Sequence, residues 1–286
     1  MLVNATAMLQ SAERNHYGIA AFNTNNLEWT RSILTAAEET QSPVIIQCTS
    51  GAAKWQTSFQ VVSDIVHTMV KTMGITVPVA LHLDHGTYED CFKCIDAGFT
   101  SIMYDGSKEP DFATNLARTK ELVKIAHNKG LSIEAEVGGI GDGGAAGEIA
   151  DPNECVAIAE AGVDFLACGI GNIHGLYPED WAGLNFDVLA DIKAKVGSLP
   201  LVLHGGTGIP ADQVAKAISM GVAKINVNTD LQVAFAKAVR EYVEAGLDQQ
   251  GKGYDPRKML KPGAEAIVAR ATEIINQYGS AGRGWE

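Results

Sequence analysis

The sequence predicts an α/β protein, a single (β/α)8 TIM barrel with an extra C-terminal helix. Short apolar runs alternate eight times with longer segments in which apolar residues recur at helical spacing. The short runs are continuously apolar, which is typical of parallel strands that are buried on both faces. Barrels of this kind exceed the usual length of one domain, so we expect residues 1–286 to form one domain.

The eight apolar runs are the predicted strands. They span residues 17–22, 43–48, 78–83, 100–104, 132–137, 165–170, 200–203 and 223–227. Segments between them, such as 27–40, 114–129 and 211–220, have the pattern of amphipathic helices. A glycine stands shortly before four of the strands, where the end of the preceding helix is expected. Residues 260–278 predict the extra helix after the eighth unit.

A doubly wound open sheet is the alternative architecture. It favours a GxGxxG turn after the first strand, but residues 22–26 (FNTNN) contain no glycine. The closed barrel is therefore the preferred prediction.

Composition excludes several classes of function. The formal net charge of −12 leaves no basic surface for nucleic acid or for an acidic membrane. No stretch reaches the roughly 20 apolar residues of a membrane span, and the first fifteen residues lack a signal-peptide pattern, so we expect a cytoplasmic protein. The five cysteines are scattered, which favours reduced thiols. Cys91 and Cys94 form one CxxC without a second pair, so we interpret them as packing residues.

Polar side chains follow the predicted strands. His85, His174 and His204 each stand shortly after an apolar run and directly before a glycine. In a closed barrel the carboxyl ends of the strands meet at one mouth, so these three imidazoles can meet. Three histidines with an open fourth position are the ligand set of a catalytic zinc site. His82 lies two residues before Asp84 in the predicted strand, so both side chains point to the same face of the sheet. We interpret His82 as a core residue or a partner of a ligand.

Other strand ends suggest what the metal acts on. The glycine-rich residues 205–208 and the pair Asn228 and Thr229 each precede a helix, where backbone N–H groups bind anions. The loops after strands seven and eight are the usual phosphate site of this fold. With Asp84 as a proton carrier beside His85, the pattern predicts metal-assisted carbonyl chemistry on a sugar phosphate.

At these residues the chain resembles the class II, metal-dependent fructose-bisphosphate aldolases and their relatives, the tagatose-bisphosphate aldolases. The resemblance covers essentially the whole chain, in the blocks FNTNNLEWT, PVALHLDHG, SIMYDGS, SIEAEVG, GNIHG, LVLHGGTG, KINVNTD and YDPRKML. It implies that His85, His174 and His204 bind catalytic Zn²⁺, and that Asp105 and Glu136 can hold a second or displaced ion. It also implies that Asp84 takes the C4 hydroxyl proton in cleavage.

The resemblance further implies a substrate site. The cradle for one phosphate comprises Gly175, Gly205, Gly206, Thr207, Asn228 and Thr229, often with a monovalent cation (Na⁺ or K⁺) nearby. Asn226 matches the amide that faces the reacting carbons. Asn23 and Thr49 match positions at the other phosphate. Arg257 resembles the arginine that reaches into a neighbouring subunit, which implies a homodimer or a tetramer.

Two features differ from the family pattern. The loop 138–148 is shorter than usual and has glycines where the family carries a pair of glutamates, one of which protonates the carbanion. Asp142 or Glu148 is the candidate replacement, with water as the alternative. Asn228 stands where fructose-type relatives often have aspartate and tagatose-type relatives alanine, so the preference at C4 stays open. No Schiff-base lysine is needed, and Lys224, near the start of strand eight, receives no role.

The leading hypothesis is zinc-dependent, reversible cleavage of fructose 1,6-bisphosphate. The first alternative is the same chemistry on tagatose 1,6-bisphosphate or another ketose phosphate. A zinc-dependent barrel hydrolase is less favoured, because those enzymes carry HxH at strand one and a bridging lysine at strand four, which this chain lacks. A non-catalytic sugar-phosphate binder is the last alternative, and only the altered loop favours it.

Overall fold

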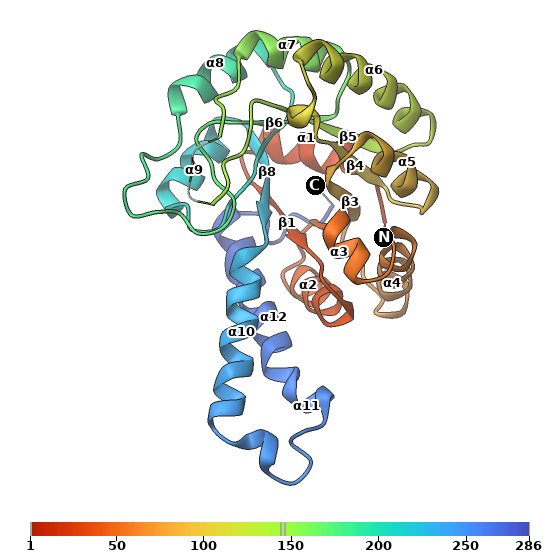
Figure 1. Ribbon diagram of the computed structural model, residues 1–286, viewed down its shortest axis with the longest axis vertical. Coiled ribbons are helices and arrows are strands. Elements are labelled where there is room, and N and C mark those ends of the chain that lie inside the picture. Colours follow the sequence, from red (N-terminus) through yellow and green to blue (C-terminus); the bar gives the residue numbers. More distant parts are fainter. Residues whose placement is uncertain (1, 144, 146, 286) are drawn as a thin grey trace.

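The computed structural model describes residues 2–143, 145 and 147–285, so Gly144 and Ala146 of the loop 138–148 lie outside it. Eight parallel strands close a barrel in the order of the chain, as predicted (Figure 1). The strands are β1 (Ile19–Asn23), β2 (Val44–Thr49), β3 (Val79–Gly86), β4 (Ser101–Tyr104), β5 (Ser132–Val137), β6 (Phe165–Cys168), β7 (Leu201–Leu203) and β8 (Val222–Val227). Each overlaps its predicted range.

Helices surround the barrel and connect successive strands (Figure 1). They are α2 (Leu27–Glu39), α3 (Ser50–Trp55), α4 (Phe59–Thr72), α5 (Tyr88–Asp96), α6 (Phe112–Asn128), α7 (Pro152–Glu160), α8 (Phe186–Val196), α9 (Ala211–Ser219) and α10 (Thr229–Glu244), with a short 3₁₀ turn, η1 (Gly106–Lys108), before α6. Side-chain caps start many of them: Asn26, Ser58 and Thr87 each accept a backbone N–H from the first turn. Caps of this kind position the βα loops that carry the polar residues.

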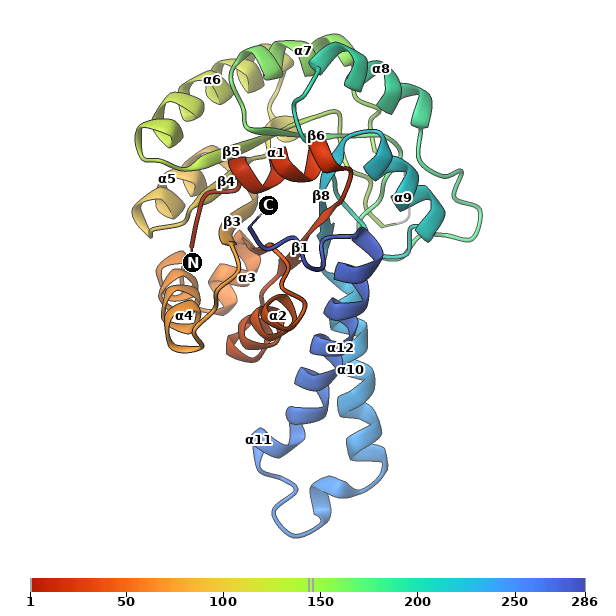
Figure 2. The same cartoon turned by 180° about the vertical axis from the view of Figure 1, so that it is seen from behind.

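A helix that the sequence analysis did not assign closes the other end of the barrel. This helix, α1 (Thr6–Asn15), lies across the amino-terminal mouth, which Figure 2 shows from behind. Met8 and Leu9 pack with the inward-facing Ile19, Ala80 and other apolar side chains in the lower half of the barrel. The functional end is therefore the opposite, carboxyl-terminal mouth.

The predicted C-terminal helix, α12 (Lys261–Tyr278), is confirmed, and it fills the place of the eighth outer helix. It packs against β1, α2 and α9, whereas α10 continues away from the barrel as one side of a projecting arm (Figure 1). A turn, η2 (Leu247–Gln249), and the short α11 (Pro256–Met259) form the tip of this arm. No helix among the described residues is long and apolar enough to cross a membrane.

All five cysteines are buried and free. Cys91 and Cys94 lie inside α5 among apolar neighbours, as interpreted from the sequence. Burial raises the pKa of the Cys48 thiol to about 12. These thiols pack in the hydrophobic core.

Candidate active site

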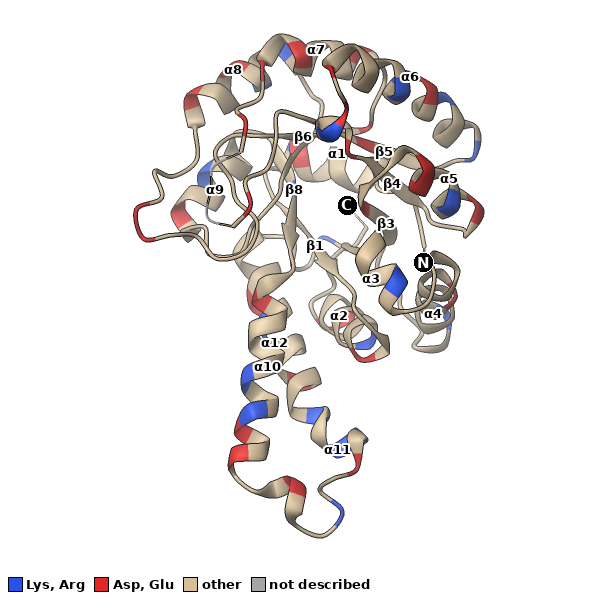
Figure 3. Cartoon of the chain, in the orientation of Figure 1, with Lys and Arg blue, Asp and Glu red and all other residues tan. Residues whose placement is uncertain are grey.

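A cavity of about 320 Å³ opens at the carboxyl-terminal mouth of the barrel. It is lined by Asn23, Thr49, Asp84, His85, Asp142, His174, Gly175, Gly205, Thr207, Asn226, Asn228 and Thr229. Every one of these residues is a site residue proposed from the sequence. They come from seven different strands or the loops that follow them, because the tips of barrel strands converge at one mouth. The surface charge around the barrel is mixed, with acidic and basic residues on most helices (Figure 3).

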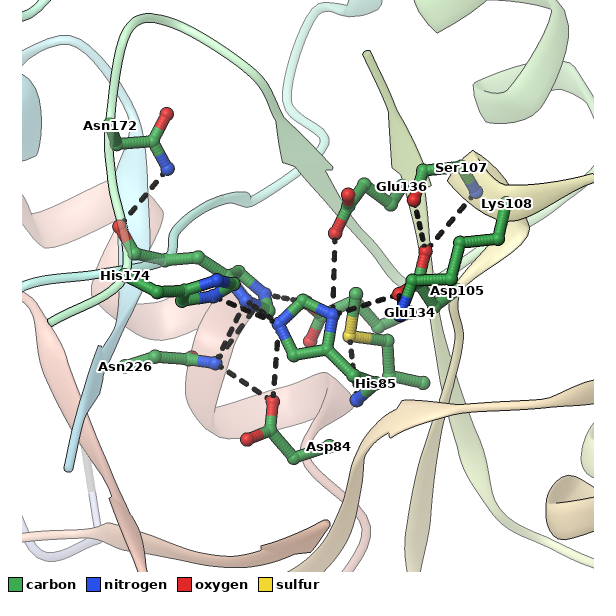
Figure 4. Close-up of polar contacts among 12 residues, drawn as sticks. Asp84, His85, Asp105, Ser107, Lys108, Glu134, Glu136, Asn172, His174 and Asn226 are labelled. Carbon is green, nitrogen blue, oxygen red and sulfur yellow. Dashed lines mark hydrogen bonds and ion pairs between the residues drawn. The ribbon is translucent and has the colours of Figure 1, made fainter. Parts of the chain in front are cut away.

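The two neighbours Asp84 and His85 both reach this cavity because β3 is irregular. In a regular strand, consecutive side chains point to opposite faces of the sheet. Here the pairing of β3 with β4 shifts between Leu83 and Gly86, and His85 has a φ of 50°, in the left-handed region. This bulge turns the imidazole back toward the cavity, where it lies beside the carboxylate of Asp84 (Figure 4).

The three predicted histidines meet, because each offers a ring nitrogen within 4.8 Å of those of the other two. Figure 4 shows His85 and His174 turned toward each other. Nε2 of His85 lies 3.2 Å from Nε2 of His174 and 2.8 Å from Nδ1 of His204. In a tetrahedral zinc site with Zn–N distances of about 2.0–2.1 Å, ligand nitrogens lie about 3.3 Å apart. The donor set therefore fits a zinc ion held by His85, His174 and His204.

Carboxylates hold two of these rings from behind. Glu134 Oε1 lies 2.8 Å from Nε2 of His204, and Asp105 Oδ2 lies 3.1 Å from Nδ1 of His85. Such contacts fix the tautomer and the orientation of metal-binding histidines. Glu136 lies close too, and His85, Asp105 and Glu136 offer ligand atoms near enough to one another for a second ion.

The charges of the site follow from this arrangement. Burial alone would lower the pKa of His85, but the carboxylates of Asp84, Asp105 and Glu136 raise it to about 9. Burial and the neighbouring His85 lower the pKa of His204 to about 4. Burial and the charge of Asp105 raise the pKa of Glu136 to about 8. The carboxylates of Asp84 and Asp105, whose pKa values are lowered despite burial, mainly by the charge of His85 and by hydrogen bonds, place negative charge around His85, which favours a bound cation.

Asp84 is held by amides on both of its oxygens. Asn23 Nδ2 donates to Oδ2 at 2.8 Å, and Asn226 Nδ2 donates to Oδ1 at 3.1 Å. Burial alone would raise the pKa of this carboxyl, but the charges of His85, His204 and Lys224 and the hydrogen bond from Asn23 bring it below its usual value. Asp84 is therefore an ionised carboxylate at the cavity floor, able to accept a proton from a bound hydroxyl.

Backbone geometry creates the proposed phosphate cradle. Gly205 has a φ of 67°, and a Cβ there would lie 2.1 Å from the carbonyl oxygen of Ile173. Thr229 begins α10 and lines the cavity together with Asn228, so the start of this helix lies at the cavity mouth. The N–H of Asp230 donates to Thr207 Oγ1 at 3.2 Å, which joins the helix start to the loop after β7. Gly206 does not line the cavity; its N–H donates to the carbonyl of Asn226 at 2.9 Å, so it supports the cradle from behind.

The shortened loop after β5 is attached to the loop after β6. Gly141 N–H donates to the carbonyl of Asn172 at 3.0 Å, and His174 N–H donates to the carbonyl of Gly141 at 2.8 Å. This pairing brings Asp142 to the cavity beside His174. Glu148 does not line the cavity and lies instead in a separate groove with Asp111.

Arg257 lies outside this chain's own cavity. It is at the tip of the projecting arm, its side chain is 88% exposed, and it pairs with Asp255 at 2.7 Å. Within one chain it therefore contacts none of the residues at the barrel mouth.

In the buried polar layer below the cavity, the sequence argument interpreted His82 as a core residue or a partner of a ligand but assigned no role to Glu134 or Lys224. Lys224 is the third residue of β8 and is fully buried, with Nζ 2.8 Å from Glu134 Oε2. His82 Nε2 lies 3.3 Å from the same carboxylate oxygen, and Gln47 donates to Asn23 at 2.8 Å. The alternation of side chains along a strand is the signal that could have identified Glu134 and Lys224. Both alternate with apolar residues in their strands and therefore face the barrel interior.

Comparisons with known proteins identify relatives of the whole chain. The family model described as "Fructose-bisphosphate aldolase class-II" matches residues 3–283. A fructose-bisphosphate aldolase of Streptococcus pyogenes is 52% identical over 292 residues, with 99% of each chain covered. One from Mycoplasma pneumoniae is 50% identical and covers 99% of this chain and 100% of that relative. The crystal structure of the YdjI aldolase from Escherichia coli K12 has a TM-score of 0.86 at 36% identity, covering 99% and 100% of the two chains.

Proposed function

Because the chain belongs to the class II fructose-bisphosphate aldolase family, we propose that it cleaves fructose 1,6-bisphosphate reversibly to dihydroxyacetone phosphate and glyceraldehyde 3-phosphate in a zinc-dependent reaction. One observation carries the proposal. Three imidazoles that fit a zinc ion and an ionised carboxylate line one cavity, with Asp84 Oδ1 3.9 Å from His85 Nε2. An aldol cleavage needs two groups next to each other: an electron-withdrawing centre at the substrate carbonyl and a base that takes the hydroxyl proton.

His85, His174 and His204 would hold the zinc. When bound, zinc supplies Lewis acidity, which polarises the substrate carbonyl and lowers the energy of negative charge on its oxygen. Glu134 and Asp105 keep the ligand rings in place from the other side. Asp105 and Glu136 are the proposed ligands of a second or displaced ion.

Asp84 performs the first proton transfer. Its carboxylate takes the proton of the C4 hydroxyl, C4 becomes the aldehyde carbon, and the electrons of the C3–C4 bond pass into the ketone half, which leaves as an enediolate. Asn23 and Asn226 hold the carboxylate oxygens during this step. In the direction of condensation, Asp84 returns the same proton to the new C4 oxygen.

The two phosphates have separate places in the proposal. Gly175, Gly205, Thr207, Asn228 and Thr229 take the phosphate of the ketone half, with Gly206 behind them, because loop N–H groups and the start of α10 favour an anion there. A monovalent cation, Na⁺ or K⁺, is proposed beside this cradle; equal rates in potassium and tetramethylammonium buffers would contradict it. Thr49 and Asn23 lie nearer the aldehyde half.

Asp142 is the proposed acid for the second proton transfer, to the carbanion carbon. It is the carboxylate of the shortened loop that lines the cavity, whereas Glu148 does not. We expect Asp142→Asn to slow deuterium exchange at the reactive carbon of dihydroxyacetone phosphate about 100-fold, the typical contribution of a general acid. Proton NMR in D₂O measures this exchange. Glu148→Gln is the matched control and should exchange at the wild-type rate; an unchanged rate in Asp142→Asn would assign the step to water.

Tagatose 1,6-bisphosphate, the C4 epimer, is the second candidate substrate. Asn228 is the observation that supports this second candidate. Its Oδ1 is buried and has no hydrogen-bond partner among the described residues, so it can accept a hydrogen bond from a substrate hydroxyl in either configuration at C4. We expect kcat/KM for fructose 1,6-bisphosphate to exceed that for the epimer by at least about tenfold, because the C4 hydroxyl must be presented to Asp84; a factor of ten corresponds to about 1.4 kcal/mol. A coupled assay with both epimers decides; a reversed ratio would assign the tagatose reaction.

The assembly and the location of the protein are further proposals. Arg257 would complete the site of a neighbouring copy in a homodimer or a tetramer, since its side chain is 88% exposed and does not line the cavity at the mouth of its own barrel. A monomer in analytical ultracentrifugation would contradict this assembly. The proposed substrate belongs to glycolysis, so we place the protein in the cytoplasm, which cell fractionation tests.

A further inference from the structure

Lys224 lies in the barrel interior, directly below the cavity floor. It is 0% exposed, and it does not line the cavity, so a bound substrate does not touch it. Its ammonium makes two short contacts: Glu134 Oε2 at 2.8 Å and Asn226 Oδ1 at 2.7 Å. Burying an ammonium is costly even when it is paired, so its contacts need an explanation beyond packing.

The contact with Asn226 sets the direction of that amide. An ammonium is a donor only, so it holds the amide oxygen of Asn226. The amide N–H₂ group then points the other way, toward Asp84 Oδ1 at 3.1 Å and His204 Nδ1 at 3.2 Å. The flipped amide would set N–H groups against the ammonium and an oxygen against a carboxylate. Lys224 therefore selects the orientation that serves the proposed reaction.

The contact with Glu134 reaches one proposed metal ligand. Glu134 Oε2 is held by Lys224, and its other oxygen, Oε1, lies 2.8 Å from Nε2 of His204. With the ring proton of His204 on Nε2, Nδ1 carries the free lone pair and can serve as a metal ligand on the side of the other two histidines. The same carboxylate also lies 3.3 Å from His82, whose ring is fixed by Ser101.

We propose that Lys224 is a positioning residue, whose single buried ammonium fixes the amide of Asn226 directly and the ring of His204 through Glu134. The inference rests on the proposed aldolase function and deepens it. A purely structural ion pair would support the fold but would leave kcat and zinc affinity of the folded protein unchanged. Measurements of kcat and of zinc affinity therefore distinguish a positioning residue from a purely structural ion pair.

Lys224→Met is the first test, because methionine has a similar length and no donor. We expect kcat to fall about 100-fold with KM within threefold, as for a misplaced reacting group. We expect the zinc dissociation constant, measured by chelator competition without substrate, to rise about 10- to 100-fold. The control is Lys237→Met in α10, where a 72% exposed lysine also pairs with a glutamate, and it should match the wild type.

A double variant tests the route through Asn226. If Lys224 acts in part through this amide, Lys224→Met slows Asn226→Ala by a smaller factor than it slows the wild type, because only the route through Glu134 is left to lose. A double variant slowed by the product of the two single effects would overturn the proposal, as would wild-type kcat and zinc affinity in Lys224→Met.

A second variant covers the case in which an unpaired Glu134 prevents folding. Lys224→Met with Glu134→Gln removes both charges but keeps an acceptor for His204, and the same loss of kcat is expected. If neither variant folds, Lys224 is a structural residue and the proposal is rejected. A wild-type protein inactive on every ketose phosphate would instead refute the proposed function, while the zinc measurement would still test the effect on His204.

Discussion

Asp84→Asn lowers kcat for cleavage by roughly 10³-fold, within the range of about 10²–10⁴ that a general base contributes. The change keeps the shape of the side chain but removes its ability to take the C4 hydroxyl proton. Asn23 and Asn226 donate to the two oxygens of Asp84 and hold this side chain at the cavity floor. Steady-state cleavage of fructose 1,6-bisphosphate measures the effect.

Deuterium exchange distinguishes the roles of Asp84 and Asp142, two carboxylates that line the cavity. Deuterium exchange of dihydroxyacetone phosphate involves no C4 hydroxyl, so Asp84→Asn should exchange within about tenfold of the wild type, whereas Asp142→Asn should not. Asp212→Asn, at an exposed position of α9, is the matched control for the loss of a carboxylate. Cleavage by Asp84→Asn within tenfold of the wild type would show that another group carries the proton.

Removal of the metal abolishes activity. The loss of a Lewis acid worth several kcal/mol corresponds to at least about 10³-fold in rate. We expect protein treated with a strong chelator and then desalted to lose cleavage of fructose 1,6-bisphosphate, and stoichiometric Zn²⁺ to restore it. Metal content by atomic absorption should rise to one zinc per chain in parallel with activity, as three converging histidines imply.

Two outcomes would contradict the zinc site. Full activity after complete chelation would remove the metal from the reaction. Equal zinc uptake by the wild type and by His174→Ala would place the ion elsewhere in the chain. The melting temperature of the metal-free protein should rise on adding zinc, because an ion that binds only the folded state stabilises it.

Much of the fold and of the cavity could be predicted from the sequence. Parallel strands buried on both faces produce continuous apolar runs, and polar residues directly after such runs must lie at the barrel mouth. His85, His174 and His204 could therefore be grouped although they are far apart in the chain. Each histidine stands shortly after the end of a predicted strand, and this alone places it at the barrel mouth. No knowledge of side-chain contacts is needed for that prediction.

The sequence was less informative about backbone irregularity and interior pairing. Strand alternation predicts Asp84 and His85 on opposite faces, and the bulge in β3 brings them to one cavity. Asp142 and Glu148 were equivalent candidates until the backbone pairing of Gly141 with the loop after β6 placed only Asp142 at the cavity. The bulge and the loop pairing both depend on how neighbouring strands align with each other. The sequence of a single strand does not specify that alignment.

The sequence alone therefore determined the eight-strand barrel, the mouth that carries the chemistry and the residue types that line it. The tertiary structure decided which way those side chains are turned: the bulge at His85, the amide of Asn226 held by Lys224, and the backbone role of Gly206. The physical reason is that strand ends are set by local apolar pattern. Orientation inside the barrel is set by contacts between strands that lie far apart in the chain, such as that between Glu134 and Lys224.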